Sequence, residues 1–313
     1  MNILFTSSGR RVELLKLAKK TLEKFGGRVV AADTCSDAPT SKFCDVFEKI
    51  APIFSADYIG QLLDICKRNS VEILVPTIDT ELEILSENAD KFEKIGVLVN
   101  ISAPNVVKIC HDKLLTQRFF EDNGVNVPRA IEPCEIPPSA DFPLFIKPRT
   151  GSSSVNTFRI DTPEQLEFFR SYVDRPIVQK LVEGEEYTVD AFCGFDSKPV
   201  TIVPRRRIAV RAGEILKGKI VADREIIDAV KDILAKLKPF GHITLQCIKN
   251  ADGIFFIEIN PRFGGGAPMS IMAGANSIEN LIRLKAGEKL GYNENWRSDI
   301  AFSRFDDSVI VDG

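Results

Sequence analysis

Histidine is scarce in this sequence, and the usual cysteine patterns are missing. Only His111 and His242 occur among the 313 residues, which excludes a histidine-rich metal centre. The seven cysteines are odd in number, scattered, and never spaced as CxxC. This distribution indicates buried, reduced thiols and therefore favours a cytoplasmic protein.

Charge excess, long apolar runs and two familiar phosphate motifs are also absent. The net charge is −3, which argues against a general nucleic-acid surface. No apolar run reaches the length that spans a bilayer. Neither GxGxxG nor GxxxxGK[ST] occurs, so a dinucleotide fingerprint and a Walker A loop are unsupported. We therefore expect a globular chain whose partners include neither nucleic acid nor membrane.

The first hundred residues alternate strands with helices. The expected strands are NILFTSS, RVVAADT, EILVPTI and VLVN. This alternation predicts a parallel sheet covered on both faces, which binds ligands at the carboxyl ends of its strands. The loops TSSGRR and PTIDTE stand at such ends, although TSSGRR is more commonly a plain helix cap. Their candidate substrate-binding residues are Gly9, Arg10, Asp79 and Glu81.

The sequence from about residue 104 onward has an α+β character. A long helix is predicted over residues 104–124, followed by a loop with five prolines. Later segments predict antiparallel strands, and ADG (residues 251–253) reads as the turn of a hairpin between the last two strands.

Oxygen-bearing side chains gather on that hairpin. Because successive strand residues alternate faces, Glu258 and Asn260 share one face in FFIEINPRFGGG. A turn at ADG pairs Gln246 near Glu258, so the three side chains converge. Buried polar groups need partners, and oxygen ligands suit a hard cation such as Mg²⁺. Taken alone, the strand end suits a half-exposed turn equally well.

Two upstream segments suit a nucleotide. FIKPRTGSSS puts Lys147 at a strand end before a Gly and Ser loop, whose N–H and hydroxyl groups can contact phosphate. In VQKLVEGEEYTVD, the backbone can meet a purine edge, and Glu186 stands seven residues after Gln179, within reach of a ribose. Alone, each segment also suits a simple turn or an exposed hairpin.

The motifs form an ordered series along the chain. In order they are HDK, FIKP…GSSS, VQKLVEGEEYTVD, RRR…R, TLQC and FIEINPRFGGG. This series resembles the ATP-grasp superfamily, and within it the halves of the carbamoyl-phosphate synthetase large subunit. The resemblance implies an α/β plus α+β fold, with a Rossmann-like pre-ATP-grasp domain over residues 1–103 and a two-lobed ATP-grasp domain over 104–313. The small lobe would span about 114–184 and the large lobe about 185–313.

The resemblance also implies a role for each matching residue. Those that would hold ATP are Lys113 and Lys147 at the phosphates, Gly151, Ser152, Ser153 and Ser154 in a flap, Gln179, Lys180 and Val182 around adenine, and Glu186 at the ribose. Those that would hold Mg²⁺, or Mn²⁺ in its place, are Gln246, Glu258 and Asn260, with Arg262 beside the transferred phosphate. Gln179 and Gln246 stand where the family often has acids. Magnesium would therefore arrive mainly with ATP.

The implied reaction is an ATP- and Mg-dependent ligation. A carboxylate takes the γ-phosphoryl group, and an amine or ammonia then displaces phosphate from the acyl phosphate. Two alternatives remain open: a carbamoyl-phosphate synthase-type subunit that works with a partner chain, and a non-catalytic nucleotide-binding regulator. The resemblance also allows a homodimer.

The segment VPRRRIAVRAGE adds a candidate anion site. A charge run of this kind is usually a solvated face. In a continuous strand, however, Arg205, Arg207 and Arg211 would point the same way. We expect Arg207 and Arg211 to hold the anionic substrate or the acyl phosphate, while the role of Arg205 stays open. Asp79 or Glu81 would receive the amine on the far side of that pocket.

Overall fold

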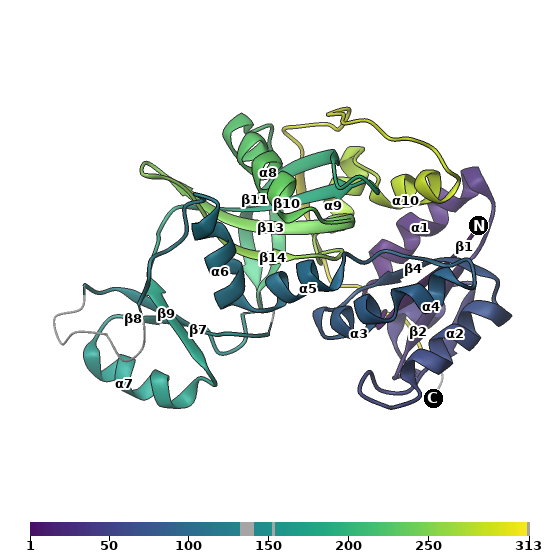
Figure 1. Ribbon diagram of the computed structural model, residues 1–313, viewed down its shortest axis with the longest axis horizontal. Coiled ribbons are helices and arrows are strands. Elements are labelled where there is room, and N and C mark those ends of the chain that lie inside the picture. The colour runs from purple at the N-terminus through teal and green to yellow at the C-terminus, as the bar shows by residue number, and fades with distance from the viewer. Residues whose placement is uncertain (132–140, 152–153, 312–313) are drawn as a thin grey trace.

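The computed structural model describes residues 1–131, 141–151 and 154–311, and the predicted flap residues Ser152 and Ser153 lie outside these ranges. Three sheets follow one another along the chain. In Figure 1 the parallel sheet lies at the right, the four-stranded sheet at the lower left, and the six-stranded sheet between them. None of the described helices is both long and apolar enough to cross a bilayer.

The first sheet is parallel, which confirms the predicted α/β domain. Its strand order is β3-β2-β1-β4-β5. The strands are β1 Asn2–Thr6, β2 Val29–Asp33, β3 Val46–Lys49, β4 Val71–Pro76 and β5 Leu98–Val99. The edge strand β3 is not among the predicted strands, because its four half-buried or exposed residues form no apolar run.

Helices cover both faces of this sheet, and one of them comes from late in the chain. α1 (Val12–Phe25) and α10 (Ser277–Lys285) share a core with Ile3 and Phe5 on one face. The opposite face, which carries Leu4, packs against helices of the first hundred residues. These are α2 Tyr58–Arg68, α3 Leu82–Glu87 and α4 Ala89–Glu93. Because α10 covers one face of the sheet, the first domain shares its hydrophobic core with a helix from late in the chain (Figure 1).

The four-stranded sheet forms the small lobe. Its antiparallel strands, in the order β6-β9-β7-β8, are β6 Ala130–Ile131, β7 Leu144–Pro148, β8 Phe158–Ile160 and β9 Pro176–Lys180. α7 (Pro163–Tyr172) packs on it through Phe169, whose ring stacks on Phe158 with centroids 4.1 Å apart. The lobe has its own small apolar core and lies to one side of the molecule (Figure 1).

The six-stranded antiparallel sheet forms the large lobe. Its order is β14-β13-β10-β11-β12-β15. The strands are β10 Glu185–Cys193, β11 Pro199–Arg211, β12 Glu214–Ile220, β13 Gly241–Asn250, β14 Gly253–Asn260 and β15 Ala301–Ser303. α8 (Arg224–Leu237) contributes six buried residues to the core on this sheet, and α9 (Ala267–Ala273) follows the glycine run. The predicted hairpin between the last two long strands is confirmed, with its turn at residues 251–252.

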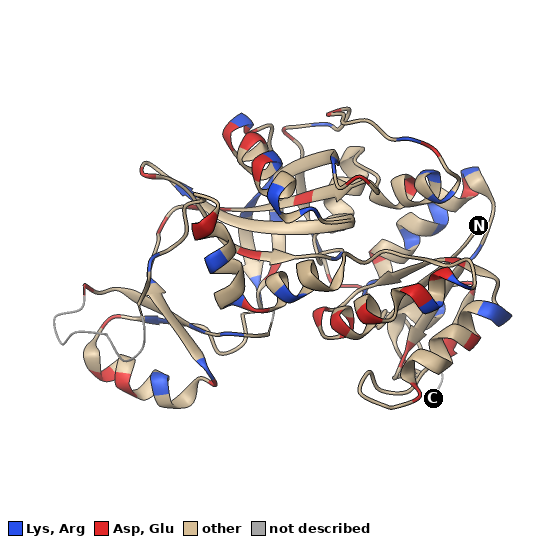
Figure 2. Ribbon diagram, in the orientation of Figure 1, with Lys and Arg blue, Asp and Glu red and all other residues tan. Residues whose placement is uncertain are grey.

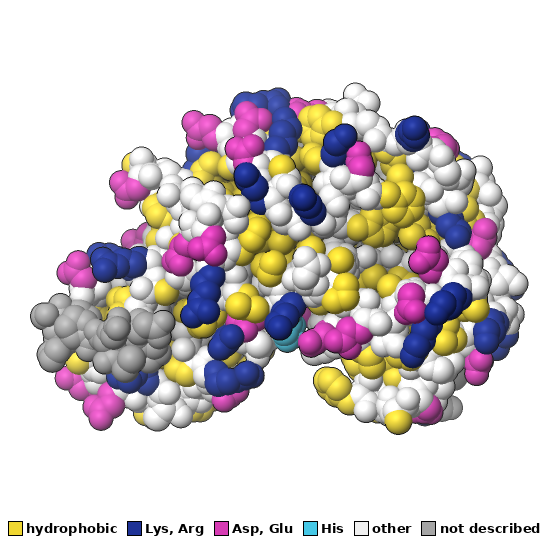
Figure 3. All heavy atoms as spheres, in the orientation of Figure 1, with side chains coloured by type: hydrophobic (Ala, Val, Ile, Leu, Met, Phe, Trp, Pro, Cys, Tyr) yellow, Lys and Arg dark blue, Asp and Glu magenta, His cyan; other side chains and the backbone are white. Residues whose placement is uncertain are grey.

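Charges of both signs are dispersed over the three parts of the molecule (Figure 2). The face shown in Figure 3 is hollowed between the small lobe and the parallel-sheet domain, and both acidic and basic side chains border the hollow. This dispersion agrees with the small net charge of −3.

The single long helix predicted over residues 104–124 is wrong. α5 (Pro104–His111) ends, and α6 (Lys113–Asp122) begins, at Asp112. One carboxylate oxygen of Asp112 accepts hydrogen bonds from the N–H groups of Leu114 (3.0 Å) and Leu115 (3.3 Å), so Asp112 caps α6. Both helices pack on β14 and bury apolar residues, so apolar spacing alone did not reveal the break.

The shared direction predicted for the three arginines of β11 fails at Arg211, whereas Arg205 and Arg207 lie in one unbroken register. The pairing register of β11 with β12 shifts between Arg207 and Ala209 and again between Ala209 and Val210. An irregularity of this kind re-aims the side chains that follow it, as a β-bulge does. Arg207 and Arg211 consequently reach different surroundings.

Candidate functional site

The β13–β14 hairpin brings its oxygen donors together. Gln246 pairs directly with Glu258 in the strand register, as predicted. The side-chain amide of Asn260 donates to Glu258 Oε1 over 3.0 Å. The amide oxygen of Gln246 accepts from Arg207 Nη1 at 3.3 Å, so in this structure it is turned toward an arginine.

These donors suit a hard cation in part. Glu258 offers a carboxylate and Asn260 an amide oxygen from the same strand, which is the chemistry Mg²⁺ prefers. No group of three or more His, Cys, Asp or Glu side chains among the described residues could hold a metal by itself. The set therefore fits a cation that brings further oxygen ligands of its own.

Lys147 occupies the junction of the two lobes. It lies on β7 of the small lobe, and its side-chain nitrogen donates to the backbone carbonyl of Ile257 on β14 at 3.5 Å. Burial lowers the pKa of Lys147 to about 8, while Glu258 opposes the shift and Lys113 adds to it. A buried ammonium beside a carboxylate is a ready partner for an incoming anion.

A small pocket of about 10 Å³ at this junction is lined by Lys113, Lys147 and Gln179, with Phe256 and Ile257 beneath. Three residues expected to hold a nucleotide thus meet in one place. The volume is about that of one water molecule, so this pocket by itself does not enclose a nucleotide.

The loop that follows Lys147 is fastened at its base. Lys113 donates to the carbonyl oxygen of Gly151 at 2.6 Å, and Arg149 Nε contacts both Asp112 oxygens at 2.8 Å. The pair between Asp112 and Arg149 was missed by the sequence analysis, which took only the lysine from HDK. Ser154 begins the described chain again after the gap, with a positive φ of 54°.

The other residues predicted to bind the nucleotide lie on, or next to, the strands at this junction. Gln179 is buried on β9, while the side chain of Lys180 is exposed and pairs with Asp141 at 3.1 Å. Val182 is half-buried just beyond β9. Glu186 is exposed on β10 and pairs with Arg207 at 3.3 Å.

Arg262 joins the large lobe to the first domain. Its Nε donates to Asp79 Oδ1 at 2.8 Å, and its Nη2 lies 3.5 Å from the amide oxygen of Asn260. Burial alone would lower the pKa of Arg262, but the carboxylates of Asp79 and Glu258 outweigh burial and raise it. Asp79, which was expected to receive an amine, is held by this guanidinium in the structure.

Glu81 does not face a pocket. It is fully buried, and its carboxylate accepts hydrogen bonds from Thr77 N (2.8 Å), Tyr58 Oη (3.0 Å) and Ser7 Oγ (3.2 Å). Burial raises the pKa of Glu81. This carboxylate organises the two loops at the sheet edge, so the predicted role of Glu81 in binding substrate is wrong.

The three glycines after Arg262 make room for close neighbours. A Cβ on Gly266 would lie 2.4 Å from a guanidinium nitrogen of Arg205, and one on Gly265 would lie 2.9 Å from Glu214. Arg205 itself is fully buried and pairs with Asp190 at 3.0 Å. The charge of Arg205 is therefore neutralised by Asp190 inside the fold.

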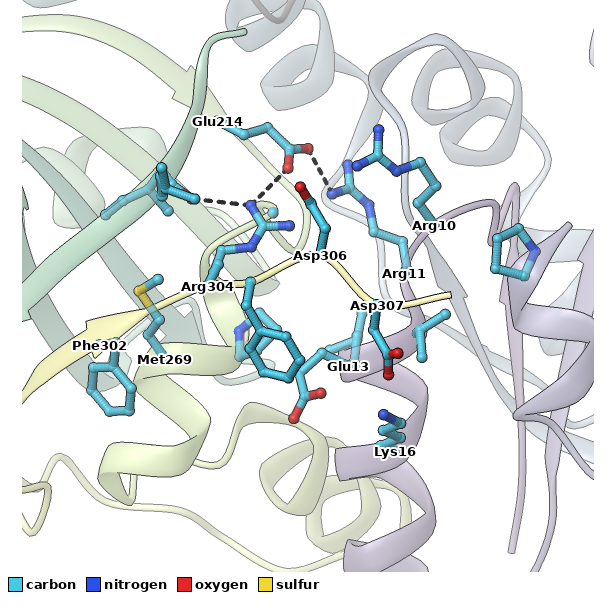
Figure 4. Close-up of a pocket in the computed structure, with 18 of the residues that line it drawn as sticks. Arg10, Arg11, Glu13, Lys16, Glu214, Met269, Phe302, Arg304, Asp306 and Asp307 are labelled. Carbon is cyan, nitrogen blue, oxygen red and sulfur yellow. Dashed lines mark hydrogen bonds and ion pairs between the residues drawn. The ribbon is translucent and has the colours of Figure 1, made fainter. Parts of the chain in front are cut away.

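A pocket of about 670 Å³, called the large pocket below, lies between the first domain and the large lobe (Figure 4). Gly264 and Gly265, which follow Arg262, form part of its wall. Glu214 accepts from Arg11 at 3.1 Å and from Arg304 at 2.8 Å, so one carboxylate bridges the two parts of the chain.

Two of the expected substrate residues, Arg10 and Arg211, line this pocket. Gly9 lies beside it, and its N–H donates to Asp33 at 2.8 Å. Arg207 does not belong to the lining, because its contacts are Gln246, Glu186 and the carbonyl of Gly213. The sequence analysis missed Arg11, Glu214 and Arg304, because the contacts between them link segments that are far apart in the sequence.

Two protein-family profiles match the chain. A PylC-like, N-terminal domain covers residues 3–100, and an ATP-grasp domain covers residues 110–266. Among curated relatives, the D-alanine–D-alanine ligase of Thermotoga petrophila is 29% identical over an alignment of 201 positions, which covers 56% of this chain. The match spans 66% of that ligase, slightly under two thirds of its length.

Solved structures show the same fold. The N5-carboxyaminoimidazole synthetase of Staphylococcus aureus superposes with a TM-score of 0.72 and 17% identity, over 93% of this chain and 78% of that one. The biotin carboxylase domain of Hydrogenobacter thermophilus 2-oxoglutarate carboxylase, solved with MgADP and bicarbonate, gives a TM-score of 0.73 and 16% identity. That match covers 96% of this chain and 73% of the other.

The fold is thus shared with enzymes, one of which was solved with MgADP and bicarbonate. This chain belongs to the ATP-grasp family, whose domain profile spans half of it. The finer likeness to the carbamoyl-phosphate synthetase large subunit stays a prediction.

Proposed function

We propose that this protein is an ATP- and Mg-dependent ligase that joins a carboxylate to an amine or ammonia through an acyl phosphate. One observation carries the proposal. Lys147 is buried at the junction of the lobes, where Glu258 acts on it, and Arg262 is close enough to both Glu258 and Glu214 for their carboxylates to raise its pKa, with Glu214 lining a pocket of about 670 Å³. A nucleotide site and a substrate-sized pocket of this arrangement suit phosphoryl transfer between them.

The residues of the chain divide the work of binding ATP. Lys113 and Lys147 would hold the phosphates from the small-lobe side, with Gly151 and Ser154 in the flap. Gln179 and the backbone of Lys180 and Val182 would meet adenine, and Glu186 the ribose. These roles agree with the pocket that Lys113, Lys147 and Gln179 share.

Glu258 and Asn260 would hold the metal together with ATP oxygens, and Gln246 would join them if it releases Arg207. Bound Mg²⁺, or Mn²⁺ in its place, neutralises phosphate charge. Arg262 would stabilise the transferred phosphoryl group, because its fixed guanidinium needs no reorganisation when charge develops. Arg207 would act on the nucleotide side, through Glu186 and Gln246.

The large pocket would hold the carboxylate and the amine. Arg10 and Arg211 supply positive charge to its rim, Gly9 lies at its edge, and Asp79 is the acid nearest to Arg262. We propose that residues 1–103 form one domain and residues 104–313 the other, and that the two lobes of the second domain meet near residue 184.

A phosphate-release screen tests this function. The protein is incubated with ATP and Mg²⁺ against small acids and amino acids, with and without amines, and products are identified by mass spectrometry. A ligase releases phosphate only when a particular acid is present. A nucleotide-binding regulator binds ATP and releases none with any combination.

The lowered pKa of Lys147 predicts a pH dependence of ATP binding. The ammonium attracts phosphate while it is protonated, and the phosphate groups of ATP are already ionised above about pH 7. Affinity should therefore fall as the pH rises through about 8, by roughly three- to tenfold between about pH 7.5 and 9. Calorimetry over this range measures the effect. Lys147→Arg keeps its charge and should remove the dependence; an identical slope in that variant would contradict the assignment.

Arg211→Ala should lower kcat/KM for the carboxylate by about tenfold and change ATP affinity by less than about twofold, because Arg211 lines the large pocket and not the lobe junction. Arg206→Ala is the matched control: Arg206 lies on the same strand in an ion pair with Glu185 at 2.7 Å. Weakened ATP binding with unchanged carboxylate use would place Arg211 with the nucleotide instead.

A further inference from the structure

The large pocket is filled in part by acidic residues of the chain itself. After β15, residues 305–309 pass along the pocket, and all five line it (Figure 4). We call these residues the acidic segment. Asp306 forms a bidentate ion pair with Arg211, at 2.6 and 2.9 Å. Asp307 extends from the opposite side of the segment in Figure 4.

The surroundings of Asp306 are strongly basic. Arg211 lowers the pKa of Asp306 through its hydrogen bonds and charge, and Arg10 and Arg304 add to this effect. Outside the acidic segment, the charged residues of the lining comprise five cations and two acids. The cations are Arg10, Arg11, Lys16, Arg211 and Arg304, and the acids are Glu13 and Glu214. The pocket without its acidic segment therefore carries an excess of positive charge.

The acidic segment is weakly attached. Arg304 still donates its N–H to the carbonyl of Leu216 at 2.8 Å, as part of the sheet edge. Beyond it, Phe305 is 84% exposed, and the carboxylate pair with Arg211 is more than half exposed on both sides. Exposed ion pairs contribute little to stability, so a ligand can displace this segment at small cost.

We propose that the acidic segment is an internal stand-in for a substrate with two carboxylates, and that this substrate displaces the segment when it binds. The inference rests on the proposed function of the large pocket. A pocket of about 670 Å³ is in the range of small-molecule sites. Its apolar wall includes Ile215, Met269 and Phe302, which fits a hydrocarbon body between the acid groups.

Two separate carboxylates fit better than one doubly charged phosphate. Asp306 and Asp307 leave the segment in opposite directions, and the cations come from both sides of the pocket: Arg10 and Lys16 from the first domain, and Arg211 from the large lobe. Arginine binds each carboxylate group in a planar, bidentate manner. The same substrate would offer one carboxylate for activation and keep the other for recognition.

Calorimetry on the full chain, without ATP, tests the inference. The probes are succinate, glutarate and adipate, with butyrate as a monocarboxylate and methyl phosphate as a phosphate monoester. We expect one of the dicarboxylates to bind at least tenfold more tightly than butyrate and methyl phosphate. In the double variant Asp306→Asn/Asp307→Asn, its Kd should fall about three- to fivefold, because the internal competitor is weakened.

Asp299→Asn is the matched control, since Asp299 forms a similarly exposed ion pair with Lys219 at 2.9 Å outside the pocket lining. It should leave the dicarboxylate Kd unchanged. In the wild-type protein, cleavage by chymotrypsin after Phe305 should become faster when the dicarboxylate binds, because the displaced segment can enter the protease cleft.

Equal binding of butyrate, preference for methyl phosphate, an unchanged Kd in the double variant, or an unchanged rate of cleavage after Phe305 would each overturn the inference. These measurements need no turnover. ATP-dependent ligation of a monocarboxylate, with no effect of the double variant, would remove this inference and keep the proposed function. Dicarboxylate binding that tightens in the double variant, without any phosphate release, would keep this inference and remove the proposed function.

Discussion

Glu258→Gln is expected to lower the rate of substrate-dependent phosphate release by about a hundredfold or more, with a nearly unchanged melting temperature. The glutamine keeps an oxygen that accepts the hydrogen bond which Asn260 donates over 3.0 Å, so the hairpin should still pack. It loses the negative charge through which Glu258 would hold the metal beside Lys147. Steady-state phosphate release and thermal unfolding measure the two effects.

A matched control lies on the other side of the same lobe. Glu225 pairs with Lys249 at 2.8 Å and is 75% exposed, so Glu225→Gln should change neither quantity. Glu258→Gln should also lower the pKa of Lys147 further, because Glu258 is the group that raises it. The proposed metal site would be lost if Glu258→Gln turned over substrate at the wild-type rate.

The second large effect is expected at Arg262. Arg262→Ala should lower turnover by about a hundredfold or more while MgATP affinity changes only a few-fold, because the guanidinium acts on the transferred group. The change should also destabilise the protein, since Asp79, whose side chain is 16% exposed in the intact pair, would lose its partner.

The double variant Asp79→Ala/Arg262→Ala separates these two effects. It removes both charges, so the free energy of unfolding should recover in part, whereas turnover should stay low. Urea unfolding and phosphate release on the two single variants and the double variant complete the cycle. Recovery of turnover together with stability would mean that Arg262 serves the interface between the domains and not the chemistry.

Local patterns in the sequence were sufficient for much of the fold. The alternation of strands and helices predicted the parallel sheet, and ADG predicted the hairpin that pairs Gln246 with Glu258. Both predictions depend on contacts between neighbouring segments, which strand periodicity and turn residues determine. The position of Lys147 near the end of a strand was predicted for the same reason, and β7 confirms that position.

Contacts between distant segments were not predictable in this way. Arg262 and Asp79 are 183 positions apart, and Arg11 and Glu214 are 203 apart. Likewise, nothing in the local pattern of α10 indicates that it covers the first sheet. The shifts in the pairing of β11 and the break between α5 and α6 at Asp112 were also missed. Apolar periodicity does not reveal a single inserted residue or a single capping residue.

The most direct test of the proposed ligase is an isotope-transfer measurement. The acid found in the phosphate-release screen is labelled with ¹⁸O in its carboxylate and incubated with the protein, ATP, Mg²⁺ and the amine. An acyl phosphate intermediate transfers one carboxylate oxygen to phosphate, so mass spectrometry should find one ¹⁸O in the phosphate for each bond formed. Phosphate released without the label would show that water, and not the carboxylate, attacks ATP, and would contradict the proposed ligation.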